Sequence, residues 1–435
     1  MKAFKSTCSG TDTQHNSKHS STSHNCNTKN KQTNPKEPKF VKRTLDKMTY
    51  DFASIENKYS YLFDDHSTLD KDDIFKKVFK YFNKAETALR NKTKLKELKL
   101  FSSKIIKELN TKLTISLVSP KENIKSGVDD IELTFSLRLN DMDKVIHNLN
   151  KTSGVKNCMH HKRKGYNEYN NKFEFKFRKG GAFIIYYKKN NAGTQIEKCF
   201  LSFRPSEAPL SSINKFFFII KESIGTGNYK SFLKSIKVIR KDLCIEIYDV
   251  PSNLILVDTK SKIKNISVFD NANSFHGTTY LGNDRNSHTA IYCMTRKLLD
   301  KVNKKYGDNI VNKIMESVSR VYCGTKIERR LKSNQQRSMS TSIKHLECIN
   351  GHQFDNLQFY SPRVFNELSE AMIRKILIKG FAKRHETFTN KELSKLKPIL
   401  GSHLLHFEHE DVCDELTSYL LAIKKVIISP KVKLK

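Results

Sequence analysis

Two acidic residues inside a strand-like stretch are the first feature of this chain whose spacing suggests chemistry. In "SIKVIRKDLCIEIYDV" (235–250), apolar and polar residues alternate around Asp242 and Glu246. Alternation with a period of two is typical of a half-buried β-strand. Residues at even spacing share a face of a strand, so Arg240, Asp242 and Glu246 are expected to point the same way. The pattern therefore predicts a strand with one apolar and one charged face.

A metal site is the chemistry that these acids suggest. Asp242 and Glu246 would lie roughly 13 Å apart in a regular strand, so one ion binds both only if a bulge or bend intervenes. A carboxylate on a neighbouring strand is the better partner for Asp242. Glu328 in "TKIERRLK" is the candidate, because Lys326 and Arg330 share its face. Hard oxygen ligands suit Mg²⁺ or Mn²⁺, which polarise a phosphoryl oxygen. The alternative, more common for strand acids, is simple pairing with a cation.

A glycine-bracketed hairpin with basic ends lies between these two strands. In "FHGTTYLGNDRNSHTAIYCMTRK" (275–297), Arg285 falls in the turn, and Arg296 and Lys297 end the second strand. Basic side chains at the end of a hairpin can grip a DNA backbone. An ordinary structural hairpin is the alternative.

The composition points to a polyanionic partner. Lys and Arg total 79 and Asp and Glu total 45, a net charge of +34 over 435 residues. Such an excess favours nucleic acid or an anionic membrane as the partner. No apolar run reaches 18 residues, so no membrane span is expected. The polar N-terminus argues against secretion, and nine scattered cysteines fit reduced thiols. We therefore predict a cytoplasmic protein that binds DNA and no membrane.

The pattern along the chain predicts an α+β fold with a central antiparallel sheet and flanking helices. Residues 1–38 form a basic tail too polar to fold alone. A helical N-terminal region (39–125) carries two amphipathic helices between 69 and 110. Strands and helices do not alternate regularly over 126–335, which excludes a parallel βαβ order. The C-terminal region (336–435) follows a polar linker and is predicted to be mostly helical.

The central region supplies the expected elements. Strands are predicted at 129–138, 197–205, 288–296 and 321–332, with a hairpin over 171–190 that turns at Gly180-Gly181. Helices are predicted at 141–150, at 211–223 with a further helix beyond Gly225 and Gly227, and at 297–319.

Three motifs in order resemble a known family. "IRKDLCIE", "GTTYLGNDRNSHTAIYCMTRK" and "KIERRLK" resemble the rolling-circle replication initiation proteins of filamentous phages and small plasmids. These proteins show an Arg-x-Asp-Leu strand with a second acid four residues on. A Gly-Thr-x-Tyr-x-Gly hairpin and an Arg/Lys-x-Glu strand follow. "KCFLSFRPSEAPL" resembles the family's strand that ends in a Pro-Ser turn. The resemblance covers roughly 126–335.

The resemblance implies a site-specific DNA nickase that also rejoins the strand. Such a protein binds a replication origin, as single- and double-stranded DNA, and a tyrosine attacks one phosphodiester. A 5′-phosphotyrosyl link forms and a free 3′-hydroxyl primes synthesis. By resemblance, the metal site consists of Asp242, Glu246 and Glu328, and the phosphate lies near Arg240, Lys326 and Arg330.

The nucleophile departs from the family pattern. In the phage branch the tyrosine follows soon after the Arg/Lys-x-Glu strand, but "SNQQRSMSTSIKH" contains none. Tyr360 is the first tyrosine afterwards. Tyr322 precedes the strand and shares the face of Glu328. Tyr292 matches a family strand tyrosine that we interpret as structural. We favour Tyr360 over Tyr322, with a packing role as the alternative for both.

Two groups of histidines are candidate metal ligands. His160 and His161 in "CMHHKRK" would point to opposite faces of a strand, so a basic loop near DNA is the better interpretation. His403, His406 and His409 fall three apart on a predicted helix, where zinc is conceivable and a polar helix face is the default.

A catalytically inactive nucleic-acid-binding protein or replication regulator is the competing hypothesis. Both hypotheses predict binding that weakens with salt, and only the nickase predicts a covalent DNA adduct. The sequence leaves open whether the C-terminal helices bind DNA, a host helicase or a second copy of the chain in a homodimer.

Overall fold

A ten-stranded antiparallel sheet dominates the part of the chain that the computed structural model describes. All described residues belong to one unit of the chain, Glu56–Lys435. They are parts of 81–91, then 94–152, 154–157, 171–177, 180–193, 195–260, 266–269, 277–282, 287–293, 324–332, 342–349 and 354–431.

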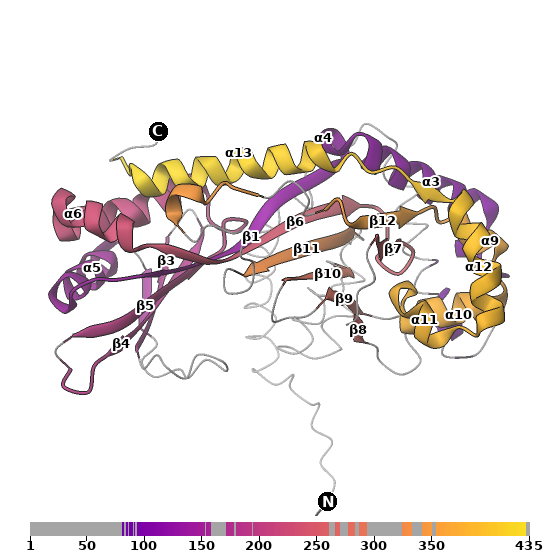
Figure 1. The fold of residues 1–435 in the computed structure, drawn as a ribbon, viewed down its shortest axis with the longest axis horizontal. Helices are drawn as coiled ribbons and strands as arrows, with labels where there is room; N and C mark the ends of the chain where they lie inside the picture. Colours follow the sequence, from indigo (N-terminus) through magenta and orange to yellow (C-terminus); the bar gives the residue numbers. More distant parts are fainter. Residues whose placement is uncertain are drawn as a thin grey trace, which may run out of the picture. The chain divides into compact units, whose positions relative to one another are not determined.

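The strands of this sheet follow the order β2-β3-β4-β5-β1-β6-β11-β10-β9-β8, and every neighbouring pair is antiparallel (Figure 1). The predicted α+β class with a central antiparallel sheet is confirmed. The bounds are β1 Ile124–Phe135, β2 Gly154–Asn157, β3 Asn171–Lys176, β4 Ala182–Lys189, β5 Ile196–Phe203, β6 Lys237–Tyr248, β8 Ile266–Phe269, β9 Thr278–Gly282, β10 Ser287–Cys293 and β11 Gly324–Lys332.

A second, three-stranded sheet has the order β13-β12-β7. It joins β7 (Leu256–Thr259) to β12 (Leu357–Tyr360) and β13 (Leu404–Leu405). The last two strands lie in the region predicted to be mostly helical. Strands of two and four residues are too short to show a recognisable alternation.

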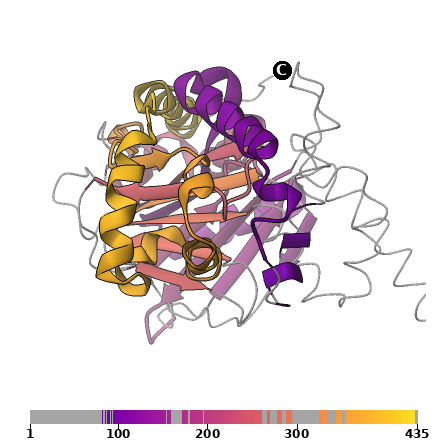
Figure 2. The ribbon, with the colours of Figure 1, turned by 90° about the vertical axis from the view of Figure 1, so that its right-hand side faces the viewer.

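Helices flank both sheets. Their bounds are η2 Lys99–Phe101, α3 Ser103–Val118, α4 Pro120–Asn123, α5 Leu139–Thr152, α6 Leu210–Ser235, η4 Ile343–His345, α9 Val364–Glu367, α10 Glu370–Lys379, η5 Phe381–Lys383, α11 Arg384–Thr387, α12 Asn390–Ser402 and α13 His409–Ile428. In Figure 2 the indigo helices and the yellow C-terminal helices stand in front of the strands. No helix among the described residues is long and apolar enough to span a bilayer.

The large sheet buries one apolar face under α6. Phe183 stacks on Phe216 of α6 with ring centroids 4.3 Å apart, and Phe203 packs edge-on against Phe217. All four rings are buried. Rings of this size remove large apolar areas from water, so this contact fixes which face of the sheet is inside. The opposite face is therefore left to carry the charged residues.

The predicted hairpin over 171–190 is confirmed, with β3 paired to β4. Gly180 and Gly181 have φ of +100° and +90°, a region that glycine enters without strain. A Cβ at Gly181 would also lie 2.5 Å from the Cβ of Ala208. The predicted break near Gly225 is confirmed too, because its φ of +78° separates two halves of α6.

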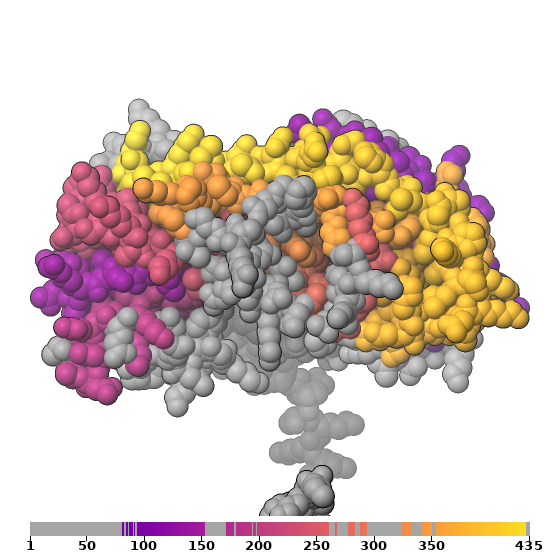
Figure 3. Space-filling model, in the orientation of Figure 1, coloured from indigo at the N-terminus to yellow at the C-terminus, as the bar shows by residue number. Residues whose placement is uncertain are grey.

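The two helical end regions pack against each other. Glu370 accepts hydrogen bonds from the backbone N–H groups of Leu95 (2.8 Å) and Lys96 (3.1 Å). In Figure 3 the purple atoms of α3 and α4 lie beside the yellow atoms of α13. The helix predicted between 95 and 110 begins only at Ser103, where Ser102 caps it, and runs on to Val118. The cap decides this start, because the Ser102 hydroxyl accepts from a first-turn N–H.

Lys241 is a buried cation on the apolar side of β6, with 1% of its surface exposed. Its ammonium donates to the carbonyl oxygens of Leu346 (3.0 Å) and Cys348 (2.9 Å). Burial lowers the pKa of Lys241 from 10.5 to about 8. Between these two pH values the unfolded chain holds a proton that the folded chain has lost. The free energy of unfolding should therefore rise by about 3 kcal/mol as the pH rises through this range.

Urea unfolding at pH 8 and pH 10 measures this effect. In Lys241→Met, the free energy of unfolding should no longer show the rise between pH 8 and pH 10 that the native chain shows. Lys237→Met, at an exposed position of the same strand, should keep it. An unchanged slope in Lys241→Met would show that the ammonium is not the titrating group.

Candidate active site on the charged face of the sheet

The register of three central strands gathers acids and cations on one face. Asp242 of β6 lies opposite Arg330 of β11, and Cys244 lies opposite Glu328. Residues directly opposite in antiparallel strands point to the same side. Asp242 and Glu328 therefore share a face on neighbouring strands, as the sequence pattern predicts.

A single guanidinium joins these two carboxylates. Nε of Arg330 lies 2.6 Å from Oε1 of Glu328 and 3.6 Å from Oδ2 of Asp242. Arg240 donates two hydrogen bonds to Asp242, one of them from Nε to Oδ1 at 2.7 Å. Arg240 also reaches Oε1 of Glu132 on β1 at 3.2 Å. The acids stand in one connected network of charge-assisted hydrogen bonds.

Glu246, the third predicted metal ligand, occupies a different place. It lies opposite Lys326 of β11, whose Nζ is 3.3 Å from Oε1 of Glu246. Lys326 also donates to Oδ1 of Asp129 at 2.9 Å. The structure thus brings Asp242 together with Glu328, and pairs Glu246 with a cation one step further along the strands.

A β-bulge in β1 adds two acids that the motif analysis did not use. The pairing of β1 with β6 shifts between Val128 and Asp130, so Asp129 is the extra residue of the bulge. Asp129 accepts from Lys326 and from the Ser206 hydroxyl at 3.0 Å, and Asp130 accepts from Ser202 at 3.3 Å. The bulge directs both acids toward the network.

The network is locally acidic in a chain with a large positive excess. The members are Asp129, Asp130, Glu132, Asp242, Glu246 and Glu328 against Arg204, Arg240, Lys326 and Arg330. Burial, opposed by Arg240 and reinforced by Glu328, raises the pKa of Asp242 to about 7. Burial and the charge of Glu132 raise the pKa of Asp130 to about 6. Surplus negative charge of this kind is stabilised by a bound cation or by protonation.

Tyr292 of β10 is the tyrosine that the described geometry brings to these acids. Its hydroxyl donates to Oε2 of Glu328 at 3.1 Å, and it lies opposite Lys326. It is only 5% exposed. Burial raises the pKa of Tyr292 well above its usual 10, with Lys326 opposing and Glu328 reinforcing the rise. The phenol is therefore neutral at physiological pH and shielded from solvent.

Tyr360, the tyrosine favoured from the sequence, belongs to the small sheet. It lies on β12, is 8% exposed and packs edge-on against Phe381 at 5.6 Å between ring centroids. Its hydroxyl donates to Gln358 at 3.4 Å. Burial and the nearby Asp258 raise its pKa. These described contacts fit a packing role and include none of the network acids.

Several predicted residues lie outside the described part of the chain. These are Tyr322, Arg285, Arg296, Lys297, His160, His161 and the tail 1–38.

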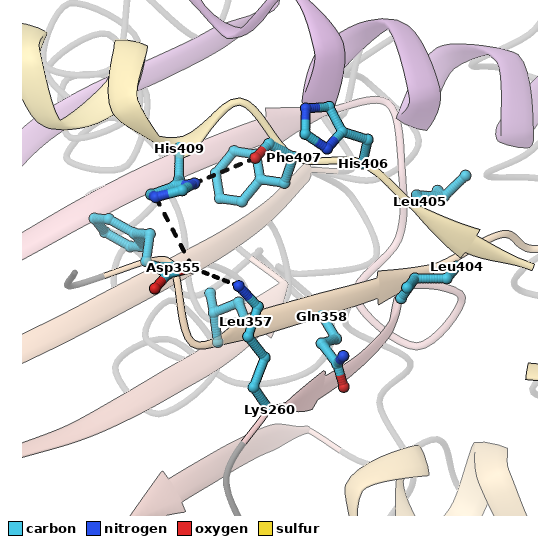
Figure 4. Close-up of a pocket in the computed structure, with 10 residues that line it drawn as sticks. Lys260, Asp355, Leu357, Gln358, Leu404, Leu405, His406, Phe407 and His409 are labelled. Atoms are coloured by element: carbon cyan, nitrogen blue, oxygen red, sulfur yellow. Dashed lines mark hydrogen bonds and ion pairs between the residues drawn. The ribbon is translucent and has the colours of Figure 1, made fainter. Parts of the chain in front are cut away.

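The three C-terminal histidines do not lie on one helix. His403 follows α12, His406 lies in an extended stretch, and α13 begins only at His409. Each has its own acidic partner: Glu367 at 2.5 Å, Glu408 at 2.6 Å and Asp355 at 3.9 Å, respectively. Figure 4 shows His409 turned toward Asp355, which Lys260 also contacts, and His406 turned away. The predicted helix is wrong here, because the β13 strand interrupts it.

The carboxylates of the network can be compared with what the implied Mg²⁺ or Mn²⁺ ion requires. Within the described ranges no three His, Cys, Asp or Glu side chains are grouped for metal binding. Mg²⁺, however, often takes only one or two carboxylates and keeps its waters for contact with phosphate. Asp242 and Glu328 both lie against one Arg330 nitrogen, at 3.6 and 2.6 Å, whereas Glu246 pairs with Lys326, so Asp242 and Glu328 are the two acids that would hold such an ion. The ion and the guanidinium would compete for these oxygens.

The sequence contains patterns that point to the further acids of the network and to Tyr292. Asp130 and Glu132 alternate in "DDIELTF" at the spacing that identified Asp242. Tyr292 occupies an even-numbered position of its strand, as Glu328 does on the next. The pattern within one strand does not, however, give the register between neighbouring strands, and this register decides which of these side chains lie close together. No protein family and no curated protein matches the chain.

Proposed function

We propose that this protein nicks and rejoins one DNA strand at a replication origin through a phosphotyrosyl intermediate, with Tyr292 as the nucleophile. The observation that carries the proposal is the hydrogen bond from Tyr292 to Glu328 inside a network of acids and arginines. It brings a hydroxyl, a proton acceptor and cationic groups to one place on the sheet. Because Tyr292 is only 5% exposed, the surrounding groups must move apart to admit the phosphodiester. The motif order described above supports the same activity.

Each side chain has a role that its contacts suggest. Glu328 accepts the phenolic proton while Tyr292 Oη bonds to phosphorus. The P–O3′ bond breaks, and the 3′ oxygen takes a proton from solvent water as it leaves. Arg330 and Arg240 neutralise charge on the phosphate oxygens. The hydrogen bond to Glu328 is needed because the pKa of Tyr292 is raised by burial, so the free phenolate is scarce. A Mg²⁺ or Mn²⁺ ion on Asp242 and Glu328 would polarise a phosphoryl oxygen.

A second function is favoured by the ion pairs themselves. The carboxylates are held by Arg240, Arg330 and Lys326, which is also how a structural sheet face would be organised. Under that alternative the protein binds nucleic acid without cutting it. Salt-dependent binding is common to both functions, so only a covalent product separates them.

Covalent transfer of labelled DNA tests the proposal. The substrate is a single-stranded pool with a random 20-nucleotide region and a dye on its 3′ end, incubated with Mn²⁺. Because the protein keeps the 5′-phosphate side, the dye should migrate with the protein on a denaturing gel. A pool dyed on its 5′ end should instead release a shortened free strand. Retention of label on native gels, with no label on denatured protein, would support the binding-only alternative.

A further inference from the structure

A cavity of about 570 Å³ opens beside the network, between α13 and the strands β1 and β6. Its size falls in the range of small-molecule pockets. Cys244 and Glu246 line it from β6, Gly127 lines it from β1, and Tyr419 lines it from α13. Figure 1 shows α13 running along these two strands.

A chain of contacts links the cavity to the proposed active site. Ser206 lines it and donates to Asp129, which Lys326 contacts in turn. Tyr292, Lys326 and Glu246 lie opposite one another on three neighbouring strands. Two strand spacings separate Tyr292 from Glu246, roughly 10 Å. That separation suits a nucleotide adjoining the attacked phosphate.

Glu246 lines the cavity with a carboxylate that lacks a described hydrogen-bond donor on one oxygen. It is 5% exposed, and its Oε1 faces Lys326 at 3.3 Å. Its Oε2 is buried and has no hydrogen-bond partner among the residues that the structure describes. A buried acceptor without a donor is destabilising, because it has lost its hydrogen bonds to water without replacement. A ligand that supplies an N–H to this carboxylate would remove that penalty.

We propose that the cavity receives one unstacked base of the DNA strand, and that Glu246 reads its exocyclic amino group. This inference rests on the proposed nicking function and names how its substrate is recognised. Cytosine and adenine carry amino donors, which carboxylates accept, whereas thymine presents a carbonyl oxygen there. The ring of Tyr419, held by its hydrogen bond to the Pro205 carbonyl at 3.1 Å, supplies a surface for stacking. Among the described lining residues the two carboxylates of Glu246 and Glu415 exceed the one ammonium, that of Lys125, so the cavity disfavours a phosphate and the base rather than the backbone enters.

Binding of single-stranded homopolymers in EDTA tests this proposal without requiring nicking. The native chain should bind dC and dA 12-mers about tenfold more tightly than a dT 12-mer. Glu246→Gln should bring this ratio close to one while changing the affinity for dT less than about twofold. An unchanged ratio, or an equal loss for all three strands, would overturn the proposal.

Tyr419 provides a second variant that does not depend on Glu246. Tyr419→Leu should weaken all three strands severalfold, because stacking contributes regardless of base. Tyr419→Phe keeps the ring and should bind as the native chain does. If Tyr419→Leu binds normally, no base stacks in the cavity. If Glu246→Gln instead weakens Mn²⁺ binding, measured by electron paramagnetic resonance, Glu246 is a metal ligand and the base assignment is wrong. Because these assays form no adduct, they can fail while nicking succeeds, and the reverse.

Discussion

Replacing Tyr292 with phenylalanine should abolish covalent attachment of DNA, by more than about 10⁴-fold, the scale on which other enzymes lose activity without their nucleophile. The substitution removes one oxygen and keeps the ring that packs on β10. It also removes the buried hydrogen bond to Glu328, and the free energy of unfolding should fall by about 1–3 kcal/mol. Transfer of 3′-dyed DNA to the protein measures the effect, and thermal unfolding checks the fold.

The matched control for this substitution is Tyr360→Phe. Tyr360 is also buried and also donates one hydrogen bond from its hydroxyl, in its case to Gln358. It should form adduct within about threefold of the native chain, since packing residues away from the reacting atoms contribute little to the chemical step. The reverse outcome, with Tyr360→Phe inactive and Tyr292→Phe active, would identify Tyr360 as the nucleophile.

Replacing Glu328 with glutamine should lower the rate of adduct formation by about 10²–10⁴-fold, the usual contribution of a positioned proton acceptor. The amide keeps the shape of the side chain and loses the charge that accepts the Tyr292 proton and faces Arg330. Equilibrium binding of single-stranded DNA should remain within about twofold, because the substitution removes a carboxylate and leaves every cationic side chain that can contact phosphate in place. Single-turnover kinetics at saturating protein separate the chemical step from binding.

Glu370→Gln is the control for a lost carboxylate–arginine pair. Glu370 contacts Arg374 at 3.1 Å on α10 rather than on the large sheet, and the loss of its charge should leave adduct formation unchanged. Normal nicking by Glu328→Gln would contradict the role of this acid. Equal loss in both variants would indicate a general effect of charge or stability.

The sequence predicted the sheet better than it predicted the site. Alternation in 235–250 and the Gly180-Gly181 turn follow from local side-chain sterics, so β6 and the β3–β4 hairpin are recovered. The shared face of Asp242 and Glu328 was also predictable, because counting along two strands is enough once both strands are paired. These are features in which local periodicity decides the outcome.

The missed features depend on contacts between distant segments. The bulge that presents Asp129 arises from the pairing of β1 with β6, about a hundred residues apart in the chain. The hydrogen bond from Tyr292 to Glu328 depends on the register of β10 with β11. A one-residue slip would send each side chain to the other face, and single-strand patterns cannot fix register. Family analogy pointed downstream to Tyr360, whereas the described contacts favour the strand tyrosine.

Mass spectrometry of the protease-digested DNA adduct tests the central claim most directly. The proposal predicts a single nucleotide-bearing peptide, the one that contains Tyr292, with the phosphate on its tyrosine oxygen. A modified peptide containing Tyr360 or Tyr322 would contradict the assignment of the nucleophile. An unmodified digest from protein that binds DNA under the same conditions would contradict the nicking function itself.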